Sequence, residues 1–311
     1  MLRPATAKDY DAIESLSKQI WGDDLKAKAN RPEGWNRRLW TVQNYMTAER
    51  KPKETSLLAE IEGQVVAAAV ITESEPRNHI YIQVAPTFRD RGFGRALFEA
   101  LDSKHKGAPY MTREFGDAEA VKMFEALGFS TVERVTEGRI DPTHPATASW
   151  IDKQLATESK LCIRSINQQS WISEREVARF FDSAFQKALA WVPVAPHTET
   201  KAIDFFLGKA IPTLCAFANQ QLIGALTMGG PGASPFDDPG AYLGWLTVAA
   251  PKGIAEADIT NALVARALDT ARKRGLDVHI EAADIFPQLH TCVWRIPGAD
   301  IEEGLTILIS D

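Results

Sequence analysis

The order of hydrophobic and polar positions along the chain predicts a mixed α/β protein. Short runs rich in β-branched and aromatic residues, which are typical of strands, alternate with stretches whose apolar residues recur at helical spacing. In the first half, strands are expected over 2–6, 56–60, 64–72, 79–84, 108–112 and 130–140, and helices over 10–20, 35–45, 94–101 and 117–128.

The same order of elements begins again about 160 residues further along the chain, which indicates an internal duplication. Between the two copies, Pro142 and Pro145 interrupt the pattern, and we expect a linker that contains a short helix. The predicted domains are therefore 1–140 and 160–311, joined by the linker 141–159. In the second half, strands are expected over 161–166, 213–219, 221–228, 241–248, 278–283 and 305–310, and helices over 173–190, 200–209 and 258–274.

One loop in the first half carries chemistry. The segment Arg89-Asp90-Arg91-Gly92-Phe93-Gly94 joins the strand 79–84 to the helix that follows it. Its glycines allow a tight turn and a close approach of the backbone to a ligand. The unpaired amides at the helix start, together with the helix dipole, favour an anion such as a diphosphate. The glycine spacing fits neither a P-loop nor a dinucleotide fingerprint, and taken alone it also fits a plain connection.

The context of this loop makes it more specific. Arg89-x-x-Gly92-x-Gly94, preceded by Val84-Ala85-Pro86, closely resembles the acyl-CoA diphosphate loop of the GNAT family of N-acetyltransferases. The helix at 117–128 resembles the family's second signature, with Asp117 at the place of an Asn and Phe124 at the place of a Tyr.

The resemblance extends to the duplication, which is similar to the tandem architecture of mycothiol-synthase-like enzymes. It implies an α/β (α+β) chain of two tandem GNAT folds, each with a mixed, mostly antiparallel twisted sheet flanked by helices. In such folds the region of the predicted helix 35–45 lies over the acceptor site, so Trp35, Trp40 and Tyr45 either line a pocket or pack the helix onto the sheet.

The resemblance also implies acetyl-CoA as co-substrate. For the arginines the alternative is a solvated helix start, and for Phe124 it is packing beneath the pantetheine arm. The implied cofactor contacts are Val84, Arg89, Asp90, Arg91, Gly92, Phe93, Gly94, Arg95, Asp117 and Phe124.

The implied reaction, direct transfer of an acetyl group to an amine, needs a polarised carbonyl, a proton acceptor and a proton for the departing thiolate. A backbone N–H near Val84, freed where the sheet splays, is the family's device for the carbonyl. Phe124 has no proton to give, and the place of the family's glutamate base falls on Asn78. Proton transfer through water to bulk solvent therefore stays open. The candidate acid–base residues nearby are Glu75, His79, Tyr110 and Glu114.

The second copy differs at the loop. Where the first has Gly92 and Gly94, the second has Glu256 and Asp258 after a longer segment. A carboxylate about 4 Å from a phosphate costs about 4 kcal/mol at an effective dielectric near 20, which is about three decades of affinity. We therefore expect the first half to be catalytic and the second to be a degenerate partner.

Composition narrows the function further. The net charge of −6 disfavours a general nucleic-acid binder, because no excess of cations is present to neutralise phosphates. No apolar run reaches the length of a membrane span, and the first residues lead into a polar helix rather than a signal sequence. The three cysteines are far apart, which favours reduced core residues of a cytoplasmic protein, and no metal site is expected.

The expected function is N-acetyl transfer from acetyl-CoA to a primary amine of a small molecule, such as an amino sugar, an aminoglycoside, a polyamine or an amino acid. The alternative is a non-catalytic acyl-CoA-binding protein that serves regulation or assembly. The sequence leaves the acceptor and the oligomeric state open.

Overall fold

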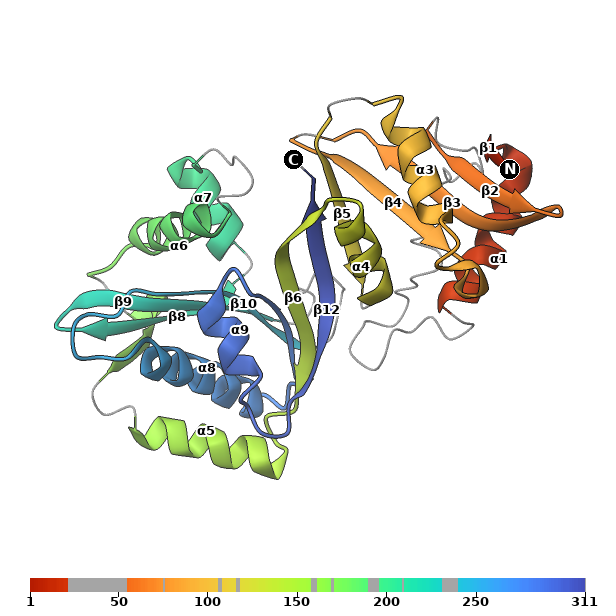
Figure 1. Cartoon of the computed structure of the whole chain (residues 1–311). Coiled ribbons are helices and arrows are strands. Elements are labelled where there is room, and N and C mark those ends of the chain that lie inside the picture. The colour runs from red at the N-terminus through yellow and green to blue at the C-terminus, as the bar shows by residue number, and fades with distance from the viewer. Residues whose placement is uncertain are drawn as a thin grey trace. The chain divides into compact units, whose positions relative to one another are not determined.

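The computed structural model describes residues 1–21, 55–74, 76–105, 108–115, 118–157, 161–168, 171–189, 196–208, 210–230 and 240–310. The chain forms two compact units, of which the first comprises Met1–Val132 with Leu305–Asp311 and the second comprises Glu133–Gly304 (Figure 1). The predicted helix 35–45, with its aromatic residues, lies outside the described residues.

The first unit is built on a sheet in which neighbouring strands pair antiparallel, except for one parallel pair, β4 with β5. Glu62 and Gly63, both with positive φ, form the turn of the predicted hairpin. The strands, in their order across the sheet, are β1 (Leu2–Pro4), β2 (Leu57–Ile61), β3 (Gln64–Thr72), β4 (Asn78–Val84) and β5 (Tyr110–Phe115), followed by Leu305–Ile309 of β12 (Asp300–Ile309).

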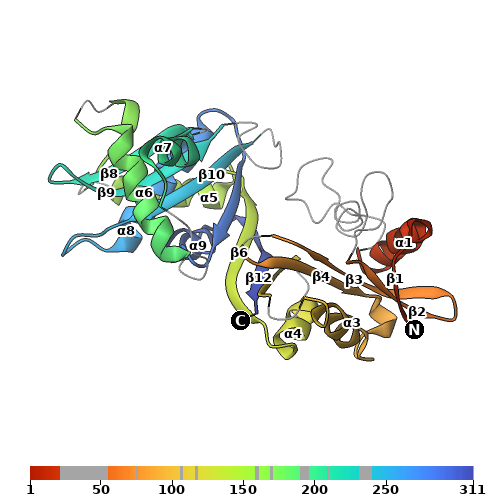
Figure 2. The ribbon, with the colours of Figure 1, turned by 90° about the horizontal axis from the view of Figure 1, so that it is seen from above.

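Helices cover both faces of this sheet (Figure 2). A short 3-10 turn, η1 (Ala7–Asp9), leads into α1 (Tyr10–Trp21), whose apolar residues pack with Tyr81 on one face. On the other face, α3 (Phe93–Asp102) and α4 (Ala118–Ala126) pack with Ile80 and Ile82. Successive residues of β4 therefore face different helices, as the two-residue period of a strand requires.

The second unit repeats the plan. One face of its sheet is covered by α5 (Pro145–Thr157), α8 (Glu256–Arg272) and α9 (Pro287–Val293), and the other by α6 (Glu174–Ala188) and α7 (Glu199–Leu207). The predicted class, mixed sheets flanked by helices, is confirmed. The strands, in their order across the sheet, are β6 (Ser130–Ile140), β11 (Val278–Ala283), β10 (Ala241–Val248), β9 (Gln221–Gly229), β8 (Ala210–Ala218) and β7 (Cys162–Ser165).

This grouping differs from the expected division into 1–140, 141–159 and 160–311. From Glu133 onward β6 belongs with the second unit, because Val135–Ile140 pairs with β11. The expected linker contains α5, which packs against α8 through a buried Ile151. The last five residues of β12 belong with the first unit, because they pair with β5.

Two further findings concern a helix that was not predicted and the length of the helices. The seven-residue helix α9 is too short for a periodic signal and was not predicted. In the described part of the chain, no helix combines the length and the apolar character that a membrane crossing requires.

Candidate active site

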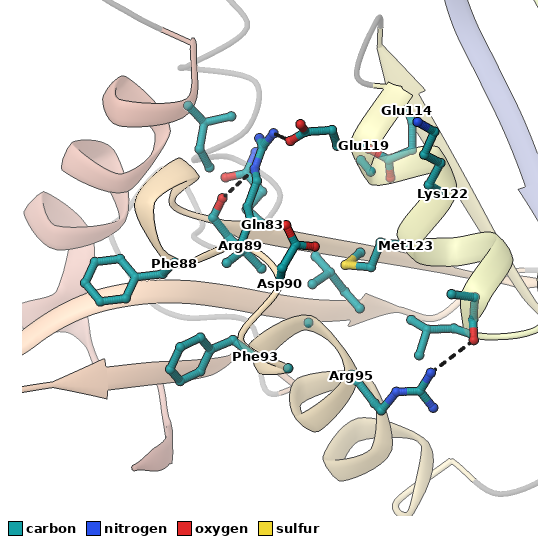
Figure 3. A pocket seen from close by; sticks show the side chains of 18 residues that line it. Gln83, Phe88, Arg89, Asp90, Phe93, Arg95, Glu114, Glu119, Lys122 and Met123 are labelled. Atoms are coloured by element: carbon teal, nitrogen blue, oxygen red, sulfur yellow. Dashed lines mark hydrogen bonds and ion pairs between the residues drawn. The ribbon is translucent and has the colours of Figure 1, made fainter.

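A gap in the first unit's sheet defines the site. The pairing of β4 with β5 involves Asn78 with Tyr110 and His79 with Met111. Beyond these two pairs β4 continues to Val84 and β5 to Phe115, so the facing edges separate. A cavity of about 490 Å³ opens there, lined by residues of β4, β5, α1, α4 and the glycine loop (Figure 3).

The glycine loop borders this cavity at the start of α3. Gly92 precedes the helix with a φ of +82°, a left-handed conformation that costs other residues free energy, although an added Cβ would meet no atom within 4 Å. The first amides of a helix have no intrahelical acceptors, and here no side chain caps them. Residues 92–95 line the cavity, so the uncapped helix start lies in its wall, and anion binding there stays a prediction.

Gly94 has a different role from Gly92. A Cβ at this position would lie 2.4 Å from Sδ of Met123 on α4, closer than any normal contact. The second glycine of the motif therefore allows α3 and α4 to pack closely beside the cavity. A larger residue here would require the flexible Met123 side chain to move, and the predicted approach of the backbone to a ligand stays a prediction.

Two of the three predicted arginines line the cavity. Arg89 forms an ion pair with Glu119 at the start of α4, and its Nε lies 3.5 Å from the carbonyl oxygen of Val84 (Figure 3). Arg95 donates from Nη2 to the carbonyl oxygen of Ala126 at 3.2 Å. Both side chains thus connect the glycine-loop region to other parts of the cavity wall.

The remaining predicted cofactor residues either line the cavity, lie elsewhere in the first unit, or fall outside the described residues. Val84, Asp90 and Phe93 line the cavity. The Arg91 guanidinium instead lies 5.0 Å from the centre of the Phe88 ring, and Arg91 is not part of the cavity wall.

Phe124 is fully buried and also does not line the cavity. Its ring packs edge-on against Phe129, with 5.0 Å between the ring centres. Phe124 therefore supports α4 from within the core, and the structure does not bring it to a ligand. Asp117 lies outside the described residues.

The candidate acid–base residues are not brought together. Tyr110 is buried, and its hydroxyl donates to Oδ1 of Asp102 at 3.0 Å, so burial and this carboxylate raise the pKa of Tyr110. His79 is half-buried and stacks on Tyr81, and burial followed by the Arg113 charge lowers its pKa. Neither residue lines the cavity. Glu75 lies outside the described residues.

Glu114 differs from these candidates because it lines the cavity from β5. Its Oε1 accepts a hydrogen bond from the Thr112 hydroxyl at 2.6 Å, which orients the carboxylate. Of the four candidates, Glu114 lies in the cavity wall, whereas His79 and Tyr110 do not and Glu75 is outside the described residues. Sequence reasoning did not find Gln83, Glu119 or Met123, which line the cavity as well and carry no motif signal.

The corresponding helix start in the second unit has another form. There Gly253 takes the positive φ, of 92°, and two further residues precede α8, whose first turn carries Glu256 and Asp258. Glu256 also accepts a hydrogen bond from Gln288 at 3.2 Å. Carboxylates in the first turn themselves interact favourably with the positive end of the helix dipole. The absence of coenzyme A binding by this unit stays a prediction.

Comparison with known proteins agrees with the fold and the loop. A family model described as an acetyltransferase (GNAT) domain matches residues 52–131. Acetyltransferase ECA0875 of Pectobacterium atrosepticum is 34% identical over 140 residues, which span 42% of this chain and 88% of that protein. Acetyltransferase YE1169 of Yersinia enterocolitica is 34% identical over 103 residues, which span 30% and 72% of the two chains.

A solved structure extends the likeness of fold to the whole chain. The GCN5-related N-acetyltransferase from Sphaerobacter thermophilus aligns with a TM-score of 0.52 at 13% identity, covering 100% of this chain and 95% of that one. The chain belongs to the GNAT family of acetyltransferases and carries the family's fold in two successive units.

Proposed function

We propose that the first unit transfers an acetyl group from acetyl-CoA to the primary amine of a small molecule. The observation that carries this proposal is the gap between β4 and β5, which opens beside the uncapped start of α3. An open strand edge presents N–H and C=O groups that suit the amides of a pantetheine arm. The helix start suits the diphosphate to which that arm is joined.

The residues of the cavity wall fit this co-substrate. The amides of residues 92–95 bind the diphosphate, Arg89 and Arg95 add positive charge beside it, and Val84 pairs with the pantetheine arm. Gly92 keeps the backbone in the conformation that the loop needs, since an L side chain rarely adopts its φ.

The chemistry follows from the groups around the gap. Acetyl-CoA, when bound, supplies a thioester whose carbonyl carbon an amine can attack. A β4 amide near Val84 polarises that carbonyl. Glu114 accepts the proton that the ammonium must lose before attack, because only the free amine is nucleophilic. The N–C bond forms as the C–S bond breaks, and the amine's second proton passes to the sulfur, so one proton is released in total.

The first experiment tests the cofactor site by calorimetry with coenzyme A. Gly92→Glu places a carboxylate at the anion-binding end and abolishes detectable binding. Gly63→Glu is the matched control, because Gly63 has a nearly identical φ of +83° but lies in the β2–β3 turn, away from the cavity. Equal affinity in the two variants would remove the loop assignment.

The second experiment separates an enzyme from a binding module. Free thiol is measured with acetyl-CoA and a panel of small primary amines, and release above the hydrolysis background with any amine supports transfer. Glu114→Gln should then lower kcat while leaving the affinity for coenzyme A unchanged. If coenzyme A binds but no amine releases it, the first unit is a non-catalytic acyl-CoA-binding module.

A further inference from the structure

Polar side chains also approach the gap from the face of the sheet opposite to α3 and α4. Ile80 and Ile82 of β4 pack with those helices, whereas Tyr81 packs with α1. Gln83 therefore lies on the α1 face, and Ile20 of α1 lines the same cavity. The cavity thus has a cofactor side at the glycine loop and a second side beneath α1.

Gln83 offers an unused hydrogen-bond acceptor on this second side. Its Oε1 is buried and has no hydrogen-bond partner within the described part of the chain. A buried acceptor without a donor is destabilising and is uncommon in folded proteins. Because Gln83 lines the cavity, a ligand that donates a hydrogen bond there would satisfy it.

Arg113 supplies a cation on the same face. The β4–β5 register pairs His79 with Met111, so Arg113, two residues on, shares the face of Tyr81. After burial, the Arg113 charge is the second cause that lowers the pKa of His79, in agreement with this placement on the sheet. The side chain is exposed and lies outside the cavity wall, and among the residues that the structure describes it forms no ion pair.

We propose that the acceptor is an amine that also carries a carboxylate, with Gln83 accepting a hydrogen bond from its nitrogen and Arg113 binding its carboxylate. This inference rests on the proposed function. A guanidinium matches a carboxylate with two parallel hydrogen bonds, and an amide oxygen suits an N–H donor. Arg113 repels a second ammonium group, so amino-acid-like amines are favoured over polyamines.

Matched pairs of amines test the proposal. Each pair has one member with a carboxylate and one without: L-lysine and cadaverine, L-ornithine and putrescine, β-alanine and ethylamine. For the wild-type protein, kcat/KM should be about tenfold higher for the carboxylate-bearing member of the preferred pair. Arg113→Gln should bring that ratio close to one. Gln83→Leu should raise KM for both members and leave the affinity for coenzyme A unchanged.

Lys104→Gln is the charge control, because Lys104 is an exposed cation of the same unit and does not line the cavity. The proposal is overturned if the members without a carboxylate react equally well or better, or if Arg113→Gln leaves the ratio unchanged. If no amine releases thiol, the proposed function fails. Calorimetric titration of the same pairs into coenzyme A-saturated protein then decides the inference: tighter binding of the carboxylate-bearing members supports it, and equal or absent binding refutes it.

Discussion

The ion pair between Arg89 and Glu119 predicts a substitution that should tighten cofactor binding. The Glu119 carboxylate pairs with the Arg89 guanidinium, which in the proposed site binds the diphosphate. Glu119 also lines the same cavity. Glu119→Gln keeps the shape of the side chain and removes the charge. The variant should release Arg89 for the diphosphate and remove a like charge from its surroundings.

The magnitude follows from exposure and distance. The Arg89 and Glu119 side chains are 26% and 68% exposed, so the ion pair is worth at most about 1 kcal/mol. If the nearer diphosphate charge lies about 10 Å from the carboxylate in water, its repulsion adds roughly 0.4 kcal/mol, and the more distant charge adds less. Together these contributions predict an affinity for coenzyme A that is about tenfold higher.

Calorimetry at low and at high salt checks this prediction. The gain should shrink in high salt, because both contributions are electrostatic and partly exposed. Glu125→Gln on the same helix removes an equal charge outside the cavity wall and should leave the affinity unchanged. A weaker affinity for Glu119→Gln would mean that Glu119 orients Arg89 for the ligand, and the argument for competition would be refuted.

Two further substitutions test local structure in the first unit. Gly92→Ala should lower the free energy of unfolding by about 1–2 kcal/mol, because alanine is strained at the φ of +82°; an unchanged urea midpoint would contradict the left-handed loop. Asp9 accepts hydrogen bonds from Arg3 and Thr6, and the Arg3 side chain, ahead of the other contacts, lowers the pKa of Asp9 from 3.8 to about 2. The resulting stabilisation, roughly 2 kcal/mol, is complete above about pH 4 and is lost as the pH falls towards 2. Asp9→Asn should flatten the pH dependence of unfolding in this window, and an unaltered slope would exclude the carboxylate as its source.

The sequence was most informative where structure is local. The strand, turn and helix around Gly92 follow from β-branched residues, a glycine that takes a positive φ, and apolar residues at helical spacing. These preferences act between residues close in the chain, so pattern alone located them. The hairpin at Glu62-Gly63 was predictable for the same reason.

The direction in which side chains point within a helix or strand was harder to predict from the sequence. Phe124 follows a family motif but packs against Phe129, while Tyr110 bonds to Asp102 instead of facing the cavity. Both outcomes depend on which face of the helix or strand meets its neighbour. A motif specifies residue types and spacing, and it does not specify that contact.

The gap between β4 and β5 and the placement of β12 were decided by tertiary structure. The gap exists because β5 pairs with β4 over two residues and with β12 over five, and the β12 residues come from the far end of the chain. Likewise, Gln83 has no motif and becomes a candidate because its Oε1 is buried without a donor. The sequence by itself determined the GNAT-like glycine loop and a repeated order of helices and strands. Which edges open, and which polar atoms are left for a ligand, follows from long-range pairing that local preferences do not specify.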